Sequence, residues 1–342
     1  MTNSKIIVIL AACALTFGCG EAKPESNDGS SGTPKVTVVA KGLMNPSCVS
    51  FSPAGELTIC DSGNGRVVVL RDGKLVDYVT DFDTEFWKID KETDTKRFKL
   101  GPLSAIWLGK TLVVTDGGKK DGKETLLFFS GPGKANSGVA SNTMVPAGVA
   151  PEKGEGNLTG MSASGDMKMI YLCGQGSDDN SWILQCDVAG KKLSTFASAD
   201  VNGIKINSPM QILNWDDNSI LALFSGKGGA DDGLVVKWDK KTAKVLGQWQ
   251  LTGLKDPMGM ARVPGSDDLM VVDNNWALTK VNQGALARVS LKAEGKIEMS
   301  MIDIRLNGPV SCGFGPGGNL FIAQLGTEFD SDKGEVLKVS GL

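Results

Sequence analysis

Carboxylate and amide side chains recur at two kinds of position in this 342-residue chain. Residues of the first kind stand just before a proline or its equivalent: Asn45, Asn157, Ser208 and Asp256. Residues of the second kind lie in loops rich in Gly and Asp, such as 116–124, 228–233, 273–276 and 328–332. Ca²⁺ prefers oxygen ligands and takes about 6–8 of them. One hypothesis is therefore Ca²⁺ or another divalent cation held by Asn45, Asn157, Asp256 and Asp273. The alternative is that Asp, Asn and Gly recur because they form turns.

The composition excludes several kinds of chemistry. There is no His, which removes the usual general base near neutral pH and the commonest ligand of zinc and copper. Catalytic triads that use a His base are excluded for the same reason. The formal net charge of -3 also disfavours nucleic acid as a partner, because a phosphate-binding surface needs a basic excess.

The elements that must position these side chains come from a repeat. Prolines 46, 102, 209, 257 and 309 each open a short apolar run, and Leu158 opens a sixth copy that has lost its Pro. A turn and a second apolar run follow, predicted at Leu57–Asp61, Thr111–Asp116, Met169–Cys173, Ile220–Phe224, Leu269–Asp273 and Leu320–Gln324. A third strand is predicted in every copy, and a fourth in five copies, for example at Gly247–Leu251 and Ile297–Ile304.

Six four-stranded sheets in a ring form an all-β, six-bladed β-propeller. The last copy lacks a fourth strand, and Lys35–Lys41 is a spare strand before the first copy, so we expect this N-terminal strand to complete the last blade. Closure would protect a sheet edge from aggregation. We expect residues 35–342 to form one propeller; a two-domain division near Ala150 has no linker to support it.

The amino terminus has the pattern of an export signal. Residues 1–18 combine Lys5, an apolar run and a small residue, and the apolar run is too short to span a bilayer. Cys19 follows directly, which resembles the signal of bacterial lipoproteins and implies lipidation of Cys19. Cys13 is a second possible lipidation site, and cleavage without lipidation is a third possibility. Residues 19–34 are rich in Gly, Ser, Pro and charge, which is typical of a flexible tether. We expect a monomer anchored to a membrane in the periplasm or cell envelope.

The stretch 46–66, PSCVSFSPAGELTICDSGNGR, resembles an NHL-type repeat. The same pattern occurs in the group of the senescence marker protein, gluconolactonase and luciferin-regenerating enzyme, whose members are six-bladed. That resemblance implies a divalent ion that polarises an ester carbonyl, with a carboxylate assisting. The group carries a Glu shortly before the first Pro, whereas this chain has Leu43-Met44-Asn45 there. The resemblance therefore predicts the fold and says little about activity.

In propellers the innermost strands usually start at the face that carries the central pocket. We therefore expect a ligand or protein site on this face, and its candidate residues are Asn45, Asn157, Ser208, Asp256, Asp273, Asn274, Trp276 and Trp87. Asp61, Asp116 and Asp273 end equivalent strands, and we expect their carboxylates to accept backbone N–H bonds in the following turn; the alternative is that they are pocket acids.

The longest insertion, Asp81–Lys99, lies between the first two copies on the expected pocket face. Its apolar residues, Phe82, Phe86, Trp87 and Ile89, could pack over the channel as a lid, or the segment could be a simple packed excursion. Cys48 and Cys60 lie on adjacent predicted strands and would be opposed if their turn has three residues. They could form a disulfide or remain small buried hydrophobic residues.

These observations leave three hypotheses open. The first is an exported, membrane-tethered propeller that binds a small molecule or a protein through its pocket face without catalysis. The second is a divalent-metal-dependent lactonase or related hydrolase. The third is a purely structural surface protein, which would have no concave polar pocket.

Overall fold

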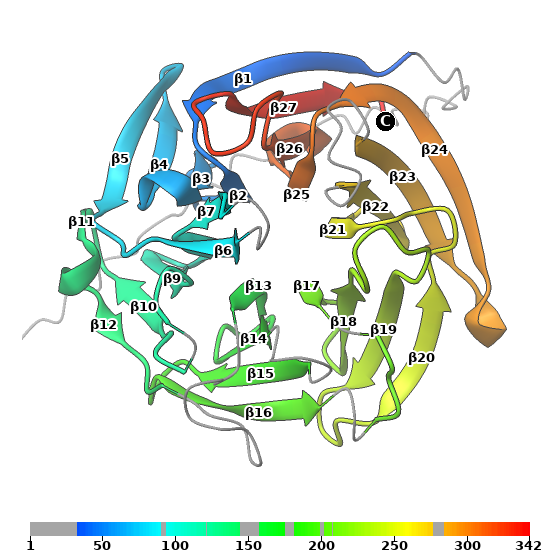
Figure 1. The fold of residues 1–342 in the computed structure, drawn as a ribbon. Helices are drawn as coiled ribbons and strands as arrows, with labels where there is room; N and C mark the ends of the chain where they lie inside the picture. The colour runs from blue at the N-terminus through cyan, green and yellow to red at the C-terminus, as the bar shows by residue number, and fades with distance from the viewer. Residues whose placement is uncertain are drawn as a thin grey trace, which may run out of the picture. The chain divides into compact units, whose positions relative to one another are not determined.

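The structure is a computed structural model that describes residues 33–89, 94–120, 122–143, 157–174, 181–198, 202–206, 208–275 and 284–342. The unit Thr33–Leu342 consists of β-sheets arranged around a ring (Figure 1). The helices in the described residues are four 3₁₀ turns, η1 (Ser62–Asn64), η2 (Ala135–Ser137), η4 (Ala293–Gly295) and η5 (Pro316–Gly318). No helix in the described part of the chain is both long and apolar enough to cross a membrane.

Each blade is an antiparallel sheet that runs from the centre of the ring outwards. The first blade contains β2 (Pro46–Phe51), β3 (Leu57–Asp61), β4 (Arg66–Arg71) and β5 (Lys74–Thr80), with β11 (Gly133–Lys134) parallel to β5. The second contains β8 (Pro102–Leu108), β9 (Thr111–Asp116), β10 (Leu126–Phe129) and β12 (Val139–Ala140). The third contains β13 (Leu158–Ala163), β14 (Met169–Gly174), β15 (Trp182–Asp187) and β16 (Lys192–Ser198).

The remaining three blades follow the same order. The fourth contains β17 (Pro209–Asn214), β18 (Ser219–Phe224), β19 (Leu234–Asp239) and β20 (Val245–Gln250). The fifth contains β21 (Pro257–Arg262), β22 (Asp268–Asp273), β23 (Gly284–Leu291) and β24 (Ile297–Leu306). The sixth contains β25 (Pro309–Phe314), β26 (Leu320–Gln324), β27 (Gly334–Ser340) and β1 (Lys35–Leu43).

Contacts between innermost strands complete the ring. Each of β2, β8, β13, β17, β21 and β25 touches the next, and β25 touches β2. The six-bladed, all-β architecture expected from the repeats is therefore confirmed. In the sixth blade β1 pairs antiparallel with β27, from Lys35 opposite Ser340 to Leu43 opposite Gly334.

The burial of each strand explains its sequence pattern. Strands in the middle of a blade are covered on both faces by neighbouring blades, so β18 is buried along its whole length and reads SILALF. The outermost strand β20 has one face in solvent, and its residues alternate between partly buried and exposed. The predicted second strands agree with β3, β9 and β26 residue for residue.

Side chains near the second-strand ends brace the loops that enter the innermost strands. Asp61 Oδ1 accepts the N–H of Met44 at 2.7 Å, and Asp273 Oδ1 accepts the N–H of Asp256 at 2.6 Å. We expected these carboxylates to accept N–H groups in the following turn; the structure places the bonds in the loop that leads from the previous blade into the innermost strand of their own blade. Asp116 differs, because its Oδ2 pairs with the Lys119 ammonium at 2.6 Å in the loop that follows.

The third blade shows how the missing proline is compensated. Leu158 stands where other copies have Pro, and unlike Pro it carries a backbone N–H. The carboxylate of Glu124 accepts that N–H at 2.9 Å, and both residues are fully buried. An acidic side chain from the second blade thus satisfies the one donor that the loss of Pro created.

We predict that Glu124→Ala lowers the free energy of unfolding by about 1.5–3 kcal/mol, because a buried N–H loses a charged acceptor. Glu124→Gln keeps an acceptor oxygen and should cost less. The double variant Glu124→Ala/Leu158→Pro also lacks the N–H donor. Its loss of stability should therefore be smaller than the sum of the losses in the two single variants. Urea unfolding of the four variants measures this coupling, and additive losses would contradict the assignment.

Candidate functional site

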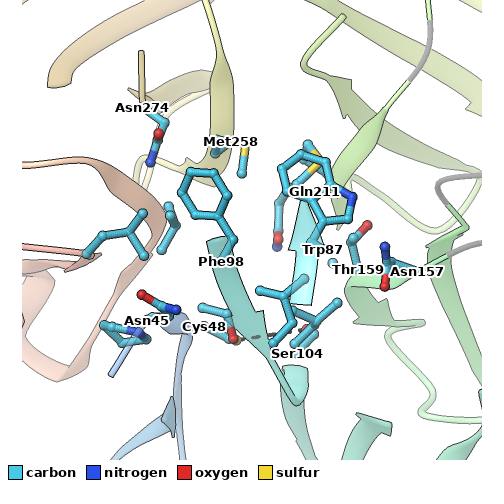
Figure 2. A pocket seen from close by; sticks show the side chains of 18 residues that line it. Asn45, Cys48, Trp87, Phe98, Ser104, Asn157, Thr159, Gln211, Met258 and Asn274 are labelled. Atoms are coloured by element: carbon cyan, nitrogen blue, oxygen red, sulfur yellow. Dashed lines mark hydrogen bonds between the residues drawn. The ribbon is translucent and has the colours of Figure 1, made fainter. Parts of the chain in front are cut away.

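A cavity of about 110 Å³ lies among the innermost strands and the hairpin β6 (Glu85–Ile89) and β7 (Lys96–Leu100). Its lining is mainly apolar and includes residues of all six blades (Figure 2). The lining residues are Asn45, Pro46, Ser47, Cys48, Trp87, Phe98, Leu100, Leu103, Ser104, Asn157, Thr159, Gly160, Met210, Gln211, Met258, Asn274, Val310 and Leu325. None of them carries a formal charge at neutral pH.

The hairpin β6–β7 supplies the aromatic part of this lining. Trp87 and Phe98 both face the cavity, and their ring centroids are 5.9 Å apart (Figure 2). Phe86 is 38% exposed, and the Phe82 ring packs against the Phe129 ring with centroids 6.2 Å apart. Of the three aromatic residues predicted to form a lid, only Trp87 lines the cavity. The side chain of Ile89 lies outside the described residues. The insertion therefore contributes to the pocket, but of the residues named in the lid hypothesis only Trp87 is among the described lining residues.

Asp330 holds the second strand of the hairpin in place. Its carboxylate accepts the N–H groups of Phe98 at 2.9 Å and Lys99 at 2.7 Å. The amide of Asn45 donates to the same carboxylate at 2.6 Å, and its oxygen accepts the N–H of Asp330 at 3.1 Å. The rings of Phe329 and Phe98 pack in a tilted arrangement, with centroids 5.3 Å apart and an interplanar angle of 39°. The loop of the sixth blade therefore clamps the insertion over the cavity.

The clamp maintains a backbone conformation that Phe98 would otherwise disfavour. Phe98 has φ of 57°, in the left-handed region that bulky residues rarely adopt. Such a conformation persists only when surrounding bonds fix it. Nearby, Gly118 permits the base of the insertion to pass close by, because a Cβ at this position would lie 1.8 Å from the carbonyl oxygen of Asp83.

Most polar groups of the lining join one blade to the next. Ser47 Oγ donates to the carbonyl of Pro102 at 3.0 Å, and Thr159 Oγ1 donates to the carbonyl of Pro209 at 2.8 Å. Asn274 Nδ2 donates to the carbonyl of Pro309 at 3.0 Å. Asn274 Oδ1 is different: it is buried, it has no hydrogen-bond partner, and its residue is only 4% exposed. Among the described residues no group donates to this oxygen, which has almost no accessible surface.

The predicted site residues divide into three groups. Asn45, Asn157, Asn274 and Trp87 line the cavity. Ser208, Asp256 and Asp273 do not belong to its lining. Trp276 lies outside the described residues.

Two of these residues form a buried pair in the fifth blade. Asp273 accepts the N–H groups of Lys255 at 3.0 Å and Asp256 at 2.6 Å, while Asp256 accepts the N–H of Gly229 at 2.8 Å. Burial raises the pKa of Asp273 to about 6, although the two N–H groups oppose the shift. Both carboxylates therefore stabilise loops of the pocket face.

Of the four residues proposed as metal ligands, Asn45 and Asn157 line the cavity, whereas the two carboxylates, Asp256 and Asp273, do not. Asp256 and Asp273 bind backbone N–H groups away from its lining, and Asn45 is bonded to Asp330 and to the carbonyl of Lys99. Within the described ranges, no three Cys, Asp or Glu side chains are grouped so as to hold a metal ion. The two proposed carboxylate ligands therefore bind backbone groups of the rim in this structure.

The sequence reasoning missed several lining residues. Phe98 and Leu100 line the cavity from β7, and they are the two apolar residues of the run KRFKL. Their spacing of two residues places them on one face of a strand, which is a signal that could have identified them. Met210, Gln211 and Met258 gave no comparable signal, because each resembles an ordinary residue of an innermost strand.

Comparison with known proteins supports the fold as a six-bladed β-propeller. No family model and no curated protein matches the chain. A PQQ-bound aldose sugar dehydrogenase from Streptomyces coelicolor has a TM-score of 0.59 and 13% identity, over 90% of this chain and 98% of that chain. A putative oxidoreductase (glucose dehydrogenase) from Thermus thermophilus has a TM-score of 0.57 and 15% identity, over 90% of this chain and 99% of that chain.

A gluconolactonase from Xanthomonas campestris has a similar fold, with a TM-score of 0.55 and 12% identity over 90% of this chain and 89% of that chain. At these identities the similarity concerns the fold alone. Gluconolactonase and sugar dehydrogenase structures share this architecture with the chain. A shared fold does not establish a shared activity, which must be argued from the residues of the cavity.

We predict that Asp330→Ala loosens the hairpin, because the N–H groups of Phe98 and Lys99 lose a charged acceptor. Hydrogen exchange of these two amides should become faster by at least tenfold, corresponding to a loss of about 1.4 kcal/mol. Asp332→Ala is the matched control, since Asp332 is an exposed acid in the same loop that pairs with Lys333. Unchanged protection in Asp330→Ala would show that the clamp does not hold the hairpin.

We predict a specific pH dependence from Asp273. Its pKa of about 6 exceeds the unfolded value near 3.9, so the folded state binds the extra proton and the contribution of Asp273 to stability falls as pH rises from about 4 to about 6. The stability of the wild type minus that of Asp273→Asn should therefore decrease by up to about 3 kcal/mol across this window. Asp267→Asn, at an exposed carboxylate, is the control. Parallel curves for wild type and Asp273→Asn would contradict the assignment.

Proposed function

We propose that this chain is a binding protein that takes a small, neutral, mainly apolar molecule in the central cavity. The observation that carries this proposal is the lining, in which apolar side chains of the blades meet the Trp87 and Phe98 rings, and none of the described lining residues carries a formal charge. A charged ligand would lose its hydration there without gaining a counter-ion. An aromatic or alicyclic ligand would bury apolar surface and stack against the two rings.

The available acceptor further defines the ligand. Asn274 Nδ2 is already bonded to the Pro309 carbonyl, so Oδ1 is the end of the amide to which a ligand could donate once a small movement of the side chain exposes this buried oxygen. A buried acceptor without a partner carries a desolvation cost of about 1–3 kcal/mol, which a ligand O–H or N–H would recover. The preferred ligand therefore has a hydrogen-bond donor at one edge of an apolar body.

We predict that 2-naphthol binds about tenfold more tightly than 2-methoxynaphthalene, because only the former can donate to Asn274 Oδ1. Isothermal titration calorimetry measures both affinities. In Asn274→Leu the preference should disappear, whereas Trp87→Ala should weaken both ligands by roughly tenfold. Trp249→Ala is the matched control, because Trp249 lies on the outermost strand β20. Absence of binding, or equal binding by Trp87→Ala, would contradict the proposal.

We further propose that this binding protein is exported and tethered through a lipidated Cys19. The signal-like residues 1–18 and the polar tether that follows support this proposal. A tether would keep the propeller near the membrane without burying it in lipid. Cys19→Ala should move the protein from the membrane fraction to the soluble fraction, and unchanged membrane association would argue against lipidation at this residue.

A second candidate function is hydrolysis of a lactone. The observation that favours it is the fold shared with the gluconolactonase from Xanthomonas campestris. The fold comparisons favour this candidate over binding alone, whereas the neutral side chains of the described lining favour binding. Release of acid from glucono-1,5-lactone, dependent on added Ca²⁺ or Zn²⁺, would favour the hydrolase instead.

A further inference from the structure

Cys48 and Cys60 are direct partners in the register of β2 and β3. Opposed residues of an antiparallel pair have Cα atoms about 4.5–5.5 Å apart, which lies within the range of about 4.4–6.8 Å found for disulfides. Both thiols are free in this structure. The described part of the chain has five cysteines, and the other three have Ile183, Ile170 and Ile322 as register partners. Among the described cysteines, only Cys48 and Cys60 are thus direct register partners within one blade.

The two thiols differ in access. Cys48 lines the cavity and is half-buried, whereas Cys60 is completely buried behind it. The Cys48 sulfur lies 3.9 Å from Ser104 Oγ and 3.8 Å from the carbonyl oxygen of Ala105 (Figure 2). A molecule in the cavity can therefore reach Cys48, whereas Cys60 is buried and is not among the described lining residues.

The two thiols also differ in acidity. Hydrogen bonding with the Cys60 thiol is the main cause that lowers the pKa of Cys48, and it outweighs the effect of burial. Burial and the neighbouring Cys48 raise the pKa of Cys60 well above its usual range. Because the thiolate is the nucleophile in disulfide exchange, Cys48 is the attacking residue and Cys60 the residue that resolves the intermediate.

We propose that Cys48 and Cys60 form a redox-active dithiol that is oxidised to a disulfide by small, neutral organic disulfides entering the cavity. The Cys48 sulfur attacks one sulfur of the organic disulfide, whose S–S bond breaks and releases one thiol carrying the proton of Cys48. The Cys60 sulfur then attacks the Cys48 sulfur, a protein disulfide forms, and the second thiol leaves with the proton of Cys60. Two protein thiols are oxidised and one organic disulfide is reduced to two thiols.

The proposal does not depend on the ligand assigned to the cavity, since it concerns the wall of the first blade. Cys173, Cys186 and Cys312 serve as internal controls. All three are buried, and burial raises the pKa of each. Their thiols should remain unreactive in the folded protein.

The test uses the full chain, equilibrated with mixtures of 2-hydroxyethyl disulfide and 2-mercaptoethanol and quenched in acid. After unfolding, N-ethylmaleimide labels the remaining thiols, and peptide mapping by mass spectrometry locates them. Labelling of Cys48 and Cys60 should fall together as the mixture becomes more oxidising, with a linked peptide appearing. Labelling of the three control cysteines should stay constant.

Single variants separate the two roles. In Cys60→Ser the exchange should stop at a mixed disulfide between Cys48 and mercaptoethanol, and in Cys48→Ser the Cys60 thiol should stay labelled. Circular dichroism verifies folding, and the Cys→Ala variants replace any Ser variant that fails to fold. Cys48 that stays labelled in every mixture would overturn the proposal, as would oxidation of Cys60 in the absence of Cys48. A wild-type protein that stops at the mixed disulfide would overturn the resolving role.

Discussion

The loops that lead into the innermost strands depend on an acceptor for their buried backbone N–H groups. Asp61, Asp273 and Gln324 provide it near the ends of second strands, where their oxygens accept N–H groups from Met44, Asp256 and Asn307. A buried N–H without a partner would destabilise the loop and the strand behind it. The acids and amides of the rim therefore have a structural role before they can have any other, and fewer oxygens remain for a metal or for catalysis.

This constraint shapes the cavity. The carboxylates of Asp256 and Asp273 are bonded to the rim, and the described lining residues are all neutral. The inserted hairpin then adds the rings of Trp87 and Phe98, which it can present because Asp330 fixes the strand that carries Phe98. The charged side chains thus hold the loops in place, and the apolar side chains face the cavity.

The sequence allowed the fold to be predicted almost completely, because the pattern repeats six times and each copy supports the others. The site was predicted only in part. Asn45, Asn157, Asn274 and Trp87 were expected at the cavity and are there. Asp256 and Asp273 were expected in the same site, but a carboxylate that binds a backbone N–H and one that faces a ligand have the same sequence signature. The contribution of Phe98 depends on a bond from Asp330, which is 232 residues away, and no local pattern encodes such a contact.

The contacts that close the ring have a consequence for folding. The first and last strands of the ring are linked through Ser340 and Lys35, which are 305 residues apart, and the hairpin is held by a residue of the last blade. Contacts between such distant residues carry a high entropic cost of loop closure and form late. An intermediate with five finished blades would expose open sheet edges and would lack both the sixth wall and the clamp of the cavity. Occupancy of the cavity would therefore report that folding is complete, and a ligand would favour the closed ring over its partly folded precursors.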